Sequence, residues 1–491
     1  MEQVVRCSHL QVQGLRRYLR VTADMNRRTL AFALPLLASA CHSDPLPPTL
    51  DAGPLDVGVV DTGSAMDIGT VTDTGPAVDR GAPADTGAAD AGPADTGATD
   101  ASTPADVPSC AAPTPLGALT GTAWCDLPLA RPNGLTLPDG FCVRRYGNVQ
   151  SGRVLALAPN DDLFVASPST DTPGGAPPGL GSVMVVSDDN HDGLADTPRT
   201  YFTGVASVHG LLFRNNQLLY TTQNAVSASP YCTGDRAAST PVASHAHVAT
   251  LTGAVRWTHT LSQDAMGRLY VSMGQYDTNA CPVMDPRAGS VLRIGGSEPD
   301  QGTLVAAGFR NPMYIRCKEW GACYAAELSG DGWDGIGGHE KLIELHDGDR
   351  YGFPCCVDHG VPVPGLTAAG NCLDVPTSLT SFPLHNTPFG FDFAPSSWPA
   401  PYGGGLFVAQ HGYVGSWVGA GVYWSPVDPA THRPTQSPVV FVNGFGHRAA
   451  GGIEQRTADL VFARDGRAFF VDDQSGDLYW IAPTTLRMPA H

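Results

Sequence analysis

Four segments of the chain share one pattern, in which an apolar strand, a tight turn rich in Asn, Asp or Gly, and an aromatic strand follow one another. They cover residues 154–166, 211–220, 261–272 and 460–471. Each segment predicts a β-hairpin, because turn residues separate two strand-forming runs. Copies that lie tens of residues apart are typical of the blades of a β-propeller, and a β-sandwich is the alternative.

The composition favours the same all-β class. Charged residues make up 15% of the 491 residues, whereas Gly (57) and Pro (42) are abundant, as many turns require. No stretch has a sustained helical periodicity. The net charge of −18 argues against binding to nucleic acid, although twelve Asp and a single Arg between Asp44 and Cys110 contribute much of it.

Residues 25–41 have the order of an export signal, with two cations, a short apolar run and small residues before Cys41. The apolar run is too short to span a bilayer. Small residues directly before a cysteine predict a bacterial lipoprotein, in which Cys41 becomes the lipidated first residue. Ordinary secretion, with Cys41 joining the disulfides, is the alternative. Residues 1–24 then precede the true start of the protein.

Residues 42–112 are rich in Asp, Gly, Ala and Pro. From Asp51 to Asp106 an Asp returns every five or six residues, usually with Gly two positions later. A calcium-binding repeat needs denser ligands and apolar residues for a core, which this segment lacks. Because it cannot bury enough surface to offset its chain entropy, we predict a disordered, self-repelling linker. The globular domain is then expected over residues 113–487.

Twelve cysteines are many for a cytosolic enzyme. With Cys7 ahead of the expected start and Cys41 reserved for lipid, ten remain, and an even number in an exported chain predicts disulfides. Metal ligation is the alternative, but the sequence has no paired Cys-x-x-Cys spacing.

Cys317 and Cys323 flank a short turn, which brings the two arms of a hairpin within bonding reach, so we expect them to pair. The further expected pairs are Cys232 with Cys281, and Cys372 with either Cys355 or Cys356.

Oxygen-bearing side chains alternate before a glycine in the segment Asp188–Asp196, as they do in calcium-binding loops. The candidate metal ligands are Asp188, Asn190, Asp192 and Asp196. The alternative is a blade hairpin, since Asn, Asp and Gly accept the left-handed backbone angles of tight turns.

Three motifs follow one another in the middle of the chain. GFRNP (308–312) comes first, then a Gly- and Asp-rich loop (329–340), then YGFP (351–354). In this order and spacing they resemble the soluble glucose/sorbosone dehydrogenase family, six-bladed β-propellers that use pyrroloquinoline quinone (PQQ). Further similar segments are LPDGF (137–141), VHGL (208–211), LYVSMG (269–274), AQHG (409–412) and residues 452–466.

The resemblance implies sugar oxidation on the top face of the propeller. PQQ would be held there by cationic side chains, its quinone polarised by Ca²⁺, while a histidine removes the hydroxyl proton and hydride passes to the quinone. Carried over by motif, Asn279, Arg310 and Arg456 would contact the cofactor. The implied partners are a small-molecule sugar and an electron acceptor, with the membrane reached through the lipid anchor alone.

The family's catalytic base precedes the Leu-Tyr-Val-Ser strand, and at that position this chain has Arg256. Arginine stays protonated at neutral pH and is no base. His259, three residues later, is the candidate replacement, and His245 or His247 would be the others. An odd offset along a strand turns a side chain to the opposite face, so His259 needs a bulge or a register shift to take over.

Three functions follow from these expectations. The first is a PQQ-dependent sugar dehydrogenase, exported and lipid-anchored at the outer membrane or cell surface. The second is a catalytically inactive propeller that binds a ligand or a partner protein. The third is a Ca²⁺-dependent hydrolase such as a lactonase, which shares the fold class but has no motif in its favour.

Overall fold

The structure is a computed structural model. It describes residues 110, 112, 115–168, 179–276, 278, 280, 281, 283, 285–295, 300–366, 372–413, 416, 418–446 and 455–490. The export signal, Cys41, nearly all of the linker and Asn279 lie outside the described residues.

Six four-stranded antiparallel sheets form the described domain. The first contains β2 (Val154–Leu157), β3 (Leu163–Ser167), β4 (Leu180–Val186) and β5 (Arg199–Ala206). The second contains β6 (Leu211–Arg214), β7 (Gln217–Thr221), β8 (Ala225–Pro230) and β9 (Ala246–Thr250). The third contains β10 (Leu261–Gln263), β11 (Leu269–Met273), β12 (Ser290–Ile294) and β13 (Thr303–Ala307).

The fourth sheet contains β14 (Asn311–Cys317), β15 (Cys323–Leu328), β16 (His339–Leu345) and β19 (Thr380–Pro383). The fifth contains β20 (Pro388–Phe393), β21 (Leu406–Gln410), β22 (Gly421–Ser425) and β23 (Val439–Val442). The sixth contains β24 (Thr457–Phe462), β25 (Ala468–Asp472), β26 (Asp477–Pro483) and β1 (Phe141–Asn148). A small hairpin of β17 (Cys356–Asp358) and β18 (Val361–Pro362) lies between β16 and β19.

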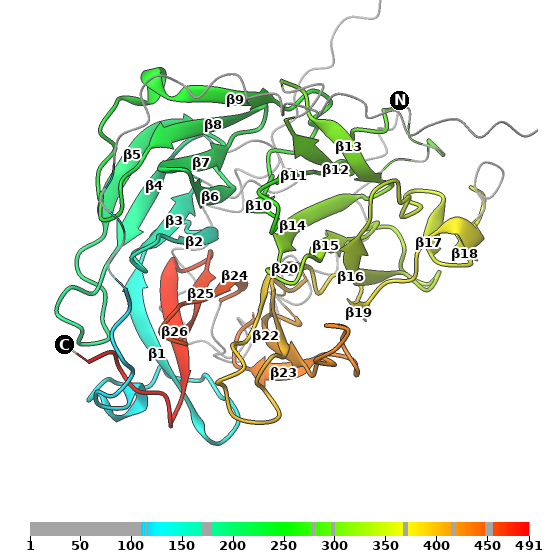
Figure 1. The fold of residues 1–491 in the computed structure, drawn as a ribbon. Helices are drawn as coiled ribbons and strands as arrows, with labels where there is room; N and C mark the ends of the chain where they lie inside the picture. Colours follow the sequence, from blue (N-terminus) through cyan, green and yellow to red (C-terminus); the bar gives the residue numbers. More distant parts are fainter. Residues whose placement is uncertain are drawn as a thin grey trace, which may run out of the picture. The chain divides into compact units, whose positions relative to one another are not determined.

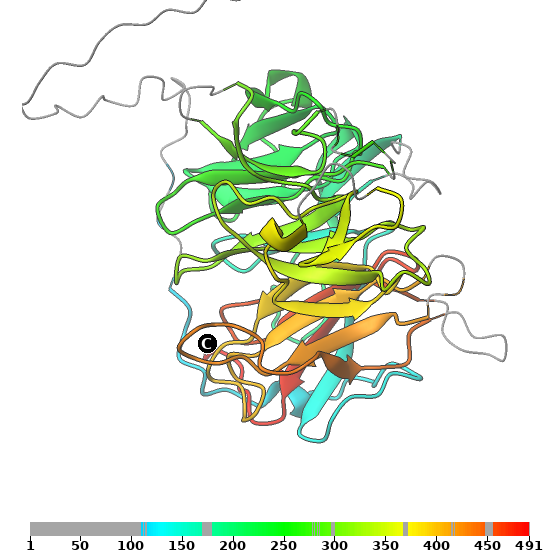
Figure 2. The ribbon, with the colours of Figure 1, turned by 90° about the vertical axis from the view of Figure 1, so that its right-hand side faces the viewer.

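The sheets are the blades of a six-bladed β-propeller, as the resemblance implied. Each innermost strand contacts the innermost strand of the next blade, from β2 through β6, β10, β14 and β20 to β24, and β24 returns to β2. Figure 1 looks into this ring and Figure 2 shows the same blades from the side. The ring closes in the sixth blade, where β1 pairs with β26 and so joins the two ends of the domain.

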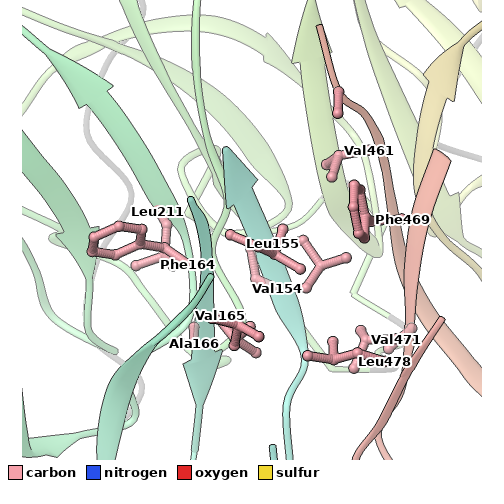
Figure 3. Packing of buried hydrophobic residues seen from close by; sticks show 14 of the residues in the cluster. Val154, Leu155, Phe164, Val165, Ala166, Leu211, Val461, Phe469, Val471 and Leu478 are labelled. Atoms are coloured by element: carbon pink, nitrogen blue, oxygen red, sulfur yellow. The ribbon is translucent and has the colours of Figure 1, made fainter. Parts of the chain in front are cut away.

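Apolar side chains between neighbouring blades form the core. Strands β11, β21 and β25 are buried along their whole length, because a blade covers each of their faces. Figure 3 shows Leu155 from the first blade pointing toward Val461 and Phe469 of the sixth. No helix among the described residues has the length and apolar character needed to cross a membrane.

The structure contains five disulfides in its described part: Cys110–Cys232, Cys125–Cys142, Cys281–Cys355, Cys317–Cys323 and Cys356–Cys372. The expected pair Cys317–Cys323 joins β14 to β15. Of the two partners left open for Cys372, the structure has Cys356.

The expected pair Cys232–Cys281 is wrong. Cys232 bonds instead to Cys110 in the segment that leads into the domain, and Cys281 bonds to Cys355. The two cysteines belong to different blades, so their spacing along the chain does not fix their separation around the ring. Disulfides in this number indicate a protein that folds outside the reducing cytosol.

Candidate functional site

The innermost strands all run in the same direction around the central channel. Arg153 directly precedes β2, Phe389 lies near the start of β20 and Arg456 directly precedes β24, and these side chains meet at one end of the channel. Arg316 and Asp392, which lie near the ends of their strands, meet at the other. We call the first the N-terminal end of the channel and the second the C-terminal end.

Three basic side chains surround one buried carboxylate at the N-terminal end. The Asp473 carboxylate lies 3.2 Å from Nη1 of Arg153, 3.0 Å from Nε2 of His411 and 2.8 Å from Nε of Arg456. All four side chains are at least nine-tenths buried. We call Arg153, His411, Arg456 and Asp473 the Asp473 cluster.

The charges of the Asp473 cluster do not cancel. Burial alone would raise the pKa of Asp473, but His411, Arg153 and Arg456 outweigh burial and hold that pKa well below its usual range. Burial, together with the charge of Arg456, lowers the pKa of His411 to about 4. At neutral pH these four side chains therefore comprise two guanidinium cations, one carboxylate and a neutral imidazole.

Aromatic rings enclose the cluster. The Arg153 guanidinium lies 5.4 Å from the ring centre of Trp257 and 5.1 Å from that of Phe389. The ring of Phe389 stacks on His411 at 4.0 Å and on Tyr314 at 5.7 Å. A cation between two rings has a fixed position, so Arg153 is held without the freedom of an exposed side chain.

Arg256 lies beside this end of the channel. Its Nε donates to the carbonyl of Gln275 at 2.7 Å, and its guanidinium lies 4.4 Å from the ring centre of Tyr276. A Cβ on Gly274 would clash with the amide oxygen of Asn311 and lie 3.1 Å from Cδ of Arg256. The glycine thus lets Arg256 and Asn311 approach one backbone position.

His259, the predicted replacement base, lies beneath the surface. Its Nδ1 is 2.8 Å from the carbonyl oxygen of Ser272 and its Nε2 is 3.1 Å from that of Gln223. The side chain is fully buried, and burial outweighs the two carbonyls and lowers its pKa to about 4. In this conformation both ring nitrogens face the backbone. The alternatives His245 and His247 lie at the start of β9, where they bond Tyr220 and Asp300.

Arg310 lies in a separate cluster of acidic groups. Its guanidinium bonds Asp331, and its backbone N–H donates to Glu327 at 3.0 Å. Glu327 is also 3.6 Å from Nζ of the buried Lys341. Burial raises the pKa of the neighbouring Glu340 to about 8, although the N–H groups of Ser329 and His385 oppose this shift. Of the predicted cofactor contacts, the structure places Arg456 in the Asp473 cluster and Arg310 here.

Several buried polar atoms at the N-terminal end have no hydrogen-bond partner among the described residues. They are Oγ1 of Thr258, Oδ1 of Asn311 and both amide atoms of Gln410. Thr258 precedes β10, Asn311 begins β14, and Gln410 ends β21 opposite the start of β20. An unsatisfied buried polar atom is costly, so several of them at one end of the channel are candidates for contact with a polar ligand.

The predicted calcium loop connects β4 to β5, away from the channel. Asp188 accepts from the N–H groups of Asp192 and Gly193, and Asp196 accepts from the N–H of Asp189. These carboxylates stabilise the turn itself. No group of three or more His, Cys, Asp or Glu side chains in the described part of the chain has a geometry that could hold a metal ion.

The prediction missed Arg153, Trp257 and Asp473. Arg153 and Asp473 are 320 positions apart in the sequence. They meet because the first and sixth blades are neighbours. The one available signal was the pair Asp472-Asp473, which follows an apolar strand directly.

No family model matches the chain, and no curated protein matches it. Solved structures do match. The calcium structure of a carbohydrate-active enzyme of family AA12 from Trichoderma reesei is 18% identical, with a TM-score of 0.57, over 73% of this chain and 99% of that one. The PQQ domain of pyranose dehydrogenase from Coprinopsis cinerea, in its holo form, is 15% identical, with a TM-score of 0.57, over 72% and 98%. A glucose dehydrogenase is 14% identical, with a TM-score of 0.50, over 71% and 99%. At these identities the likeness establishes the fold.

Proposed function

We propose that this chain is an exported oxidoreductase that uses PQQ to oxidise an aldose or sorbosone-type sugar. The observation that carries the proposal is the Asp473 cluster, with its two buried guanidinium groups, at the channel end where Thr258, Asn311 and Gln410 have unsatisfied polar atoms. The similar structures include a PQQ domain and a glucose dehydrogenase, and their names support the same class of reaction.

The described residues fit a polycarboxylate cofactor. Arg153, Arg256 and Arg456 would bind its carboxylates, because guanidinium groups form charge-assisted hydrogen bonds with carboxylates. The amides of Asn311 and Gln410 have unused hydrogen-bonding atoms for its remaining polar groups. When bound, PQQ supplies an acceptor for a hydride from the sugar. We further propose that Asn279 and Ca²⁺ complete the site.

One observation favours a second function, which is ligand binding without catalysis. A general base must reach the proton that it removes. Arg256 is not a base, and His259 directs both ring nitrogens at backbone carbonyls. In the first function, His259 turns toward the sugar on substrate binding. In the second, the propeller retains the cofactor or a similar anion and transfers no hydride.

The proposed location is the outer membrane or cell surface, with the propeller outside the cytoplasm. The disulfides support the compartment. The lipid on Cys41 and the linker that separates it from the propeller are proposals from the sequence. Mass spectrometry of the mature protein tests them, and an unmodified N-terminus elsewhere than Cys41 would contradict the anchor.

The deciding experiment adds PQQ and Ca²⁺ to the purified protein and follows the quinone absorbance together with dye reduction on a panel of aldoses. Saturable cofactor binding with turnover supports the dehydrogenase, and His259→Ala should then lose several orders of magnitude of turnover while it retains the cofactor. Binding without turnover supports the second function, and Arg256→His should then raise turnover. Failure to bind PQQ refutes the first function, and failure to bind PQQ or any other organic polycarboxylate refutes the second.

A further inference from the structure

A cavity of about 310 Å³ lies in the channel at its C-terminal end. Residues of all six innermost strands line it. Leu155 and Leu211, which Figure 3 shows near one another, are buried at its inner part. Leu157, Phe213 and Arg316 lie further along their strands and are half-buried. The exposure increases toward the strand ends, so the cavity opens on the face opposite the Asp473 cluster.

Tyr314 separates this cavity from the Asp473 cluster. Its side chain lines the cavity, and its hydroxyl donates to the carbonyl of Arg153 at 2.8 Å. Its ring stacks on Phe389, which in turn stacks on His411. The tyrosine is fully buried between the two. A ligand in the cavity would therefore not share the space of a ligand at the N-terminal end.

The polar groups of the cavity have both signs of charge. The Nη1 of Arg316 is 3.7 Å from Asp392, and its Nη2 is 3.8 Å from Asp459. Lys318 also bonds Asp392, at 3.0 Å. Burial would raise the pKa of Asp392, but Arg316 and Lys318 outweigh it and lower that pKa. Burial raises the pKa of Asp459 to about 7, against the opposing charge of Arg316.

Arg316 has hydrogen-bonding capacity to spare. A guanidinium has five N–H donors. Among the described residues its side chain makes one hydrogen bond, from Nη2 to the carbonyl of Leu460 at 3.4 Å. Both carboxylate contacts are longer than a hydrogen bond. The side chain of Arg316 is a quarter exposed and lines the cavity, where a bound acceptor would satisfy the remaining donors.

This set of groups selects against charged ligands. A cation in the cavity would be repelled by Arg316, and an anion would be repelled by Asp392 and Asp459. A hydroxyl group can accept from the guanidinium and donate to a carboxylate at once. The leucines and Val461 provide apolar walls for the C–H groups of such a molecule.

We propose that the C-terminal end of the channel is a second binding site, whose ligand is a small uncharged polyol of monosaccharide size. Arg316 donates to its hydroxyl oxygens, and Asp392 and Asp459 accept from its hydroxyl groups. The site is independent of the function proposed for the Asp473 cluster.

Isothermal titration calorimetry of the full domain tests the proposal, with D-glucose, xylitol and myo-inositol as probes and without added PQQ. A ligand of this size is expected to bind with a dissociation constant on the order of 1 mM. Arg316→Met retains the apolar stem but removes the donors, and it should weaken binding by about tenfold or more, as the loss of hydrogen bonds from a charged group does. Gln263→Trp should block the half-buried mouth with no loss of charge.

Arg433→Met is the matched control. Arg433 is half-exposed, pairs with Glu344 at 2.8 Å and does not line the cavity, so its replacement should leave binding unchanged. If Arg316→Met fails to fold, Gln263→Trp decides the result. Three results would overturn the proposal. They are the absence of saturable binding to all three polyols, binding by both cavity variants that is as tight as that of the wild type, and tighter binding of acetate or guanidinium than of any polyol.

Discussion

At the scale of single residues, the Asp473 carboxylate holds several buried groups together. Two buried guanidinium groups and an imidazole contact its carboxylate. Asp473→Asn removes the negative charge and leaves the cations of Arg153 and Arg456 buried without it. We expect a loss of about 3–5 kcal/mol in the free energy of unfolding, as for other broken buried ion pairs.

Chemical denaturation measures this loss. The control is Asp347→Asn, which removes the carboxylate of an exposed ion pair with Arg293 and should cost less than about 1 kcal/mol. Equal unfolding free energies for the two variants would show that the Asp473 cluster does not stabilise the fold.

His259 also belongs to this scale, through pH. Its folded pKa of about 4 lies below the value of about 6.5 for an unfolded histidine. The stability that the neutral ring contributes is therefore present above pH 6.5 and is lost as the pH falls through the folded pKa. The difference in unfolding free energy between the wild type and His259→Asn should shrink by up to about 3 kcal/mol from pH 7 to pH 4. A difference that stays constant over this range would mean that the ring is charged or exposed in the folded state.

At the scale of elements, the innermost strands approach so closely that one position tolerates no side chain. A Cβ on Gly210, which precedes β6, would lie 2.6 Å from the carbonyl oxygen of His259 and 2.9 Å from Cα of Thr260. These are backbone atoms of the next blade and cannot turn away. Gly210→Ala should destabilise the domain by about 1–3 kcal/mol or more, measured by thermal or chemical unfolding.

Gly332→Ala is the control for this prediction, because a Cβ there meets nothing within 4 Å and the backbone is not left-handed. It should change the unfolding free energy by less than about 0.5 kcal/mol. If Gly210→Ala were as mild as this control, the blades would have to be free to move apart.

The elements were also the part of the fold that the sequence predicted best. The four hairpins expected at 154–166, 211–220, 261–272 and 460–471 are the two inner strands of the first, second, third and sixth blades. Local turn chemistry and strand propensity determine such hairpins. The Asp473 cluster and the partner of Cys232 depend on which blades are neighbours and on the angle between them, and spacing along the chain does not contain that information.

At the scale of the whole molecule, the propeller should be independent of the segment that precedes it. Residues 45–108 have no apolar set with which to dock on a domain. Deletion of this segment should leave the melting temperature, PQQ binding and any turnover unchanged. Differential scanning calorimetry measures the melting temperature. A melting temperature several degrees lower in the truncated protein would show that the segment packs against the domain.

The closing blade has a consequence for how the protein is made. Strand β1 is among the first parts of the domain to be synthesised, but its partner β26 ends only eight residues before the end of the chain at His491. Until then β1 has an unpaired edge, which is a template for aggregation. The ring therefore closes only once β26 has been synthesised, and until then the edge of β1 is open to pairing with other chains.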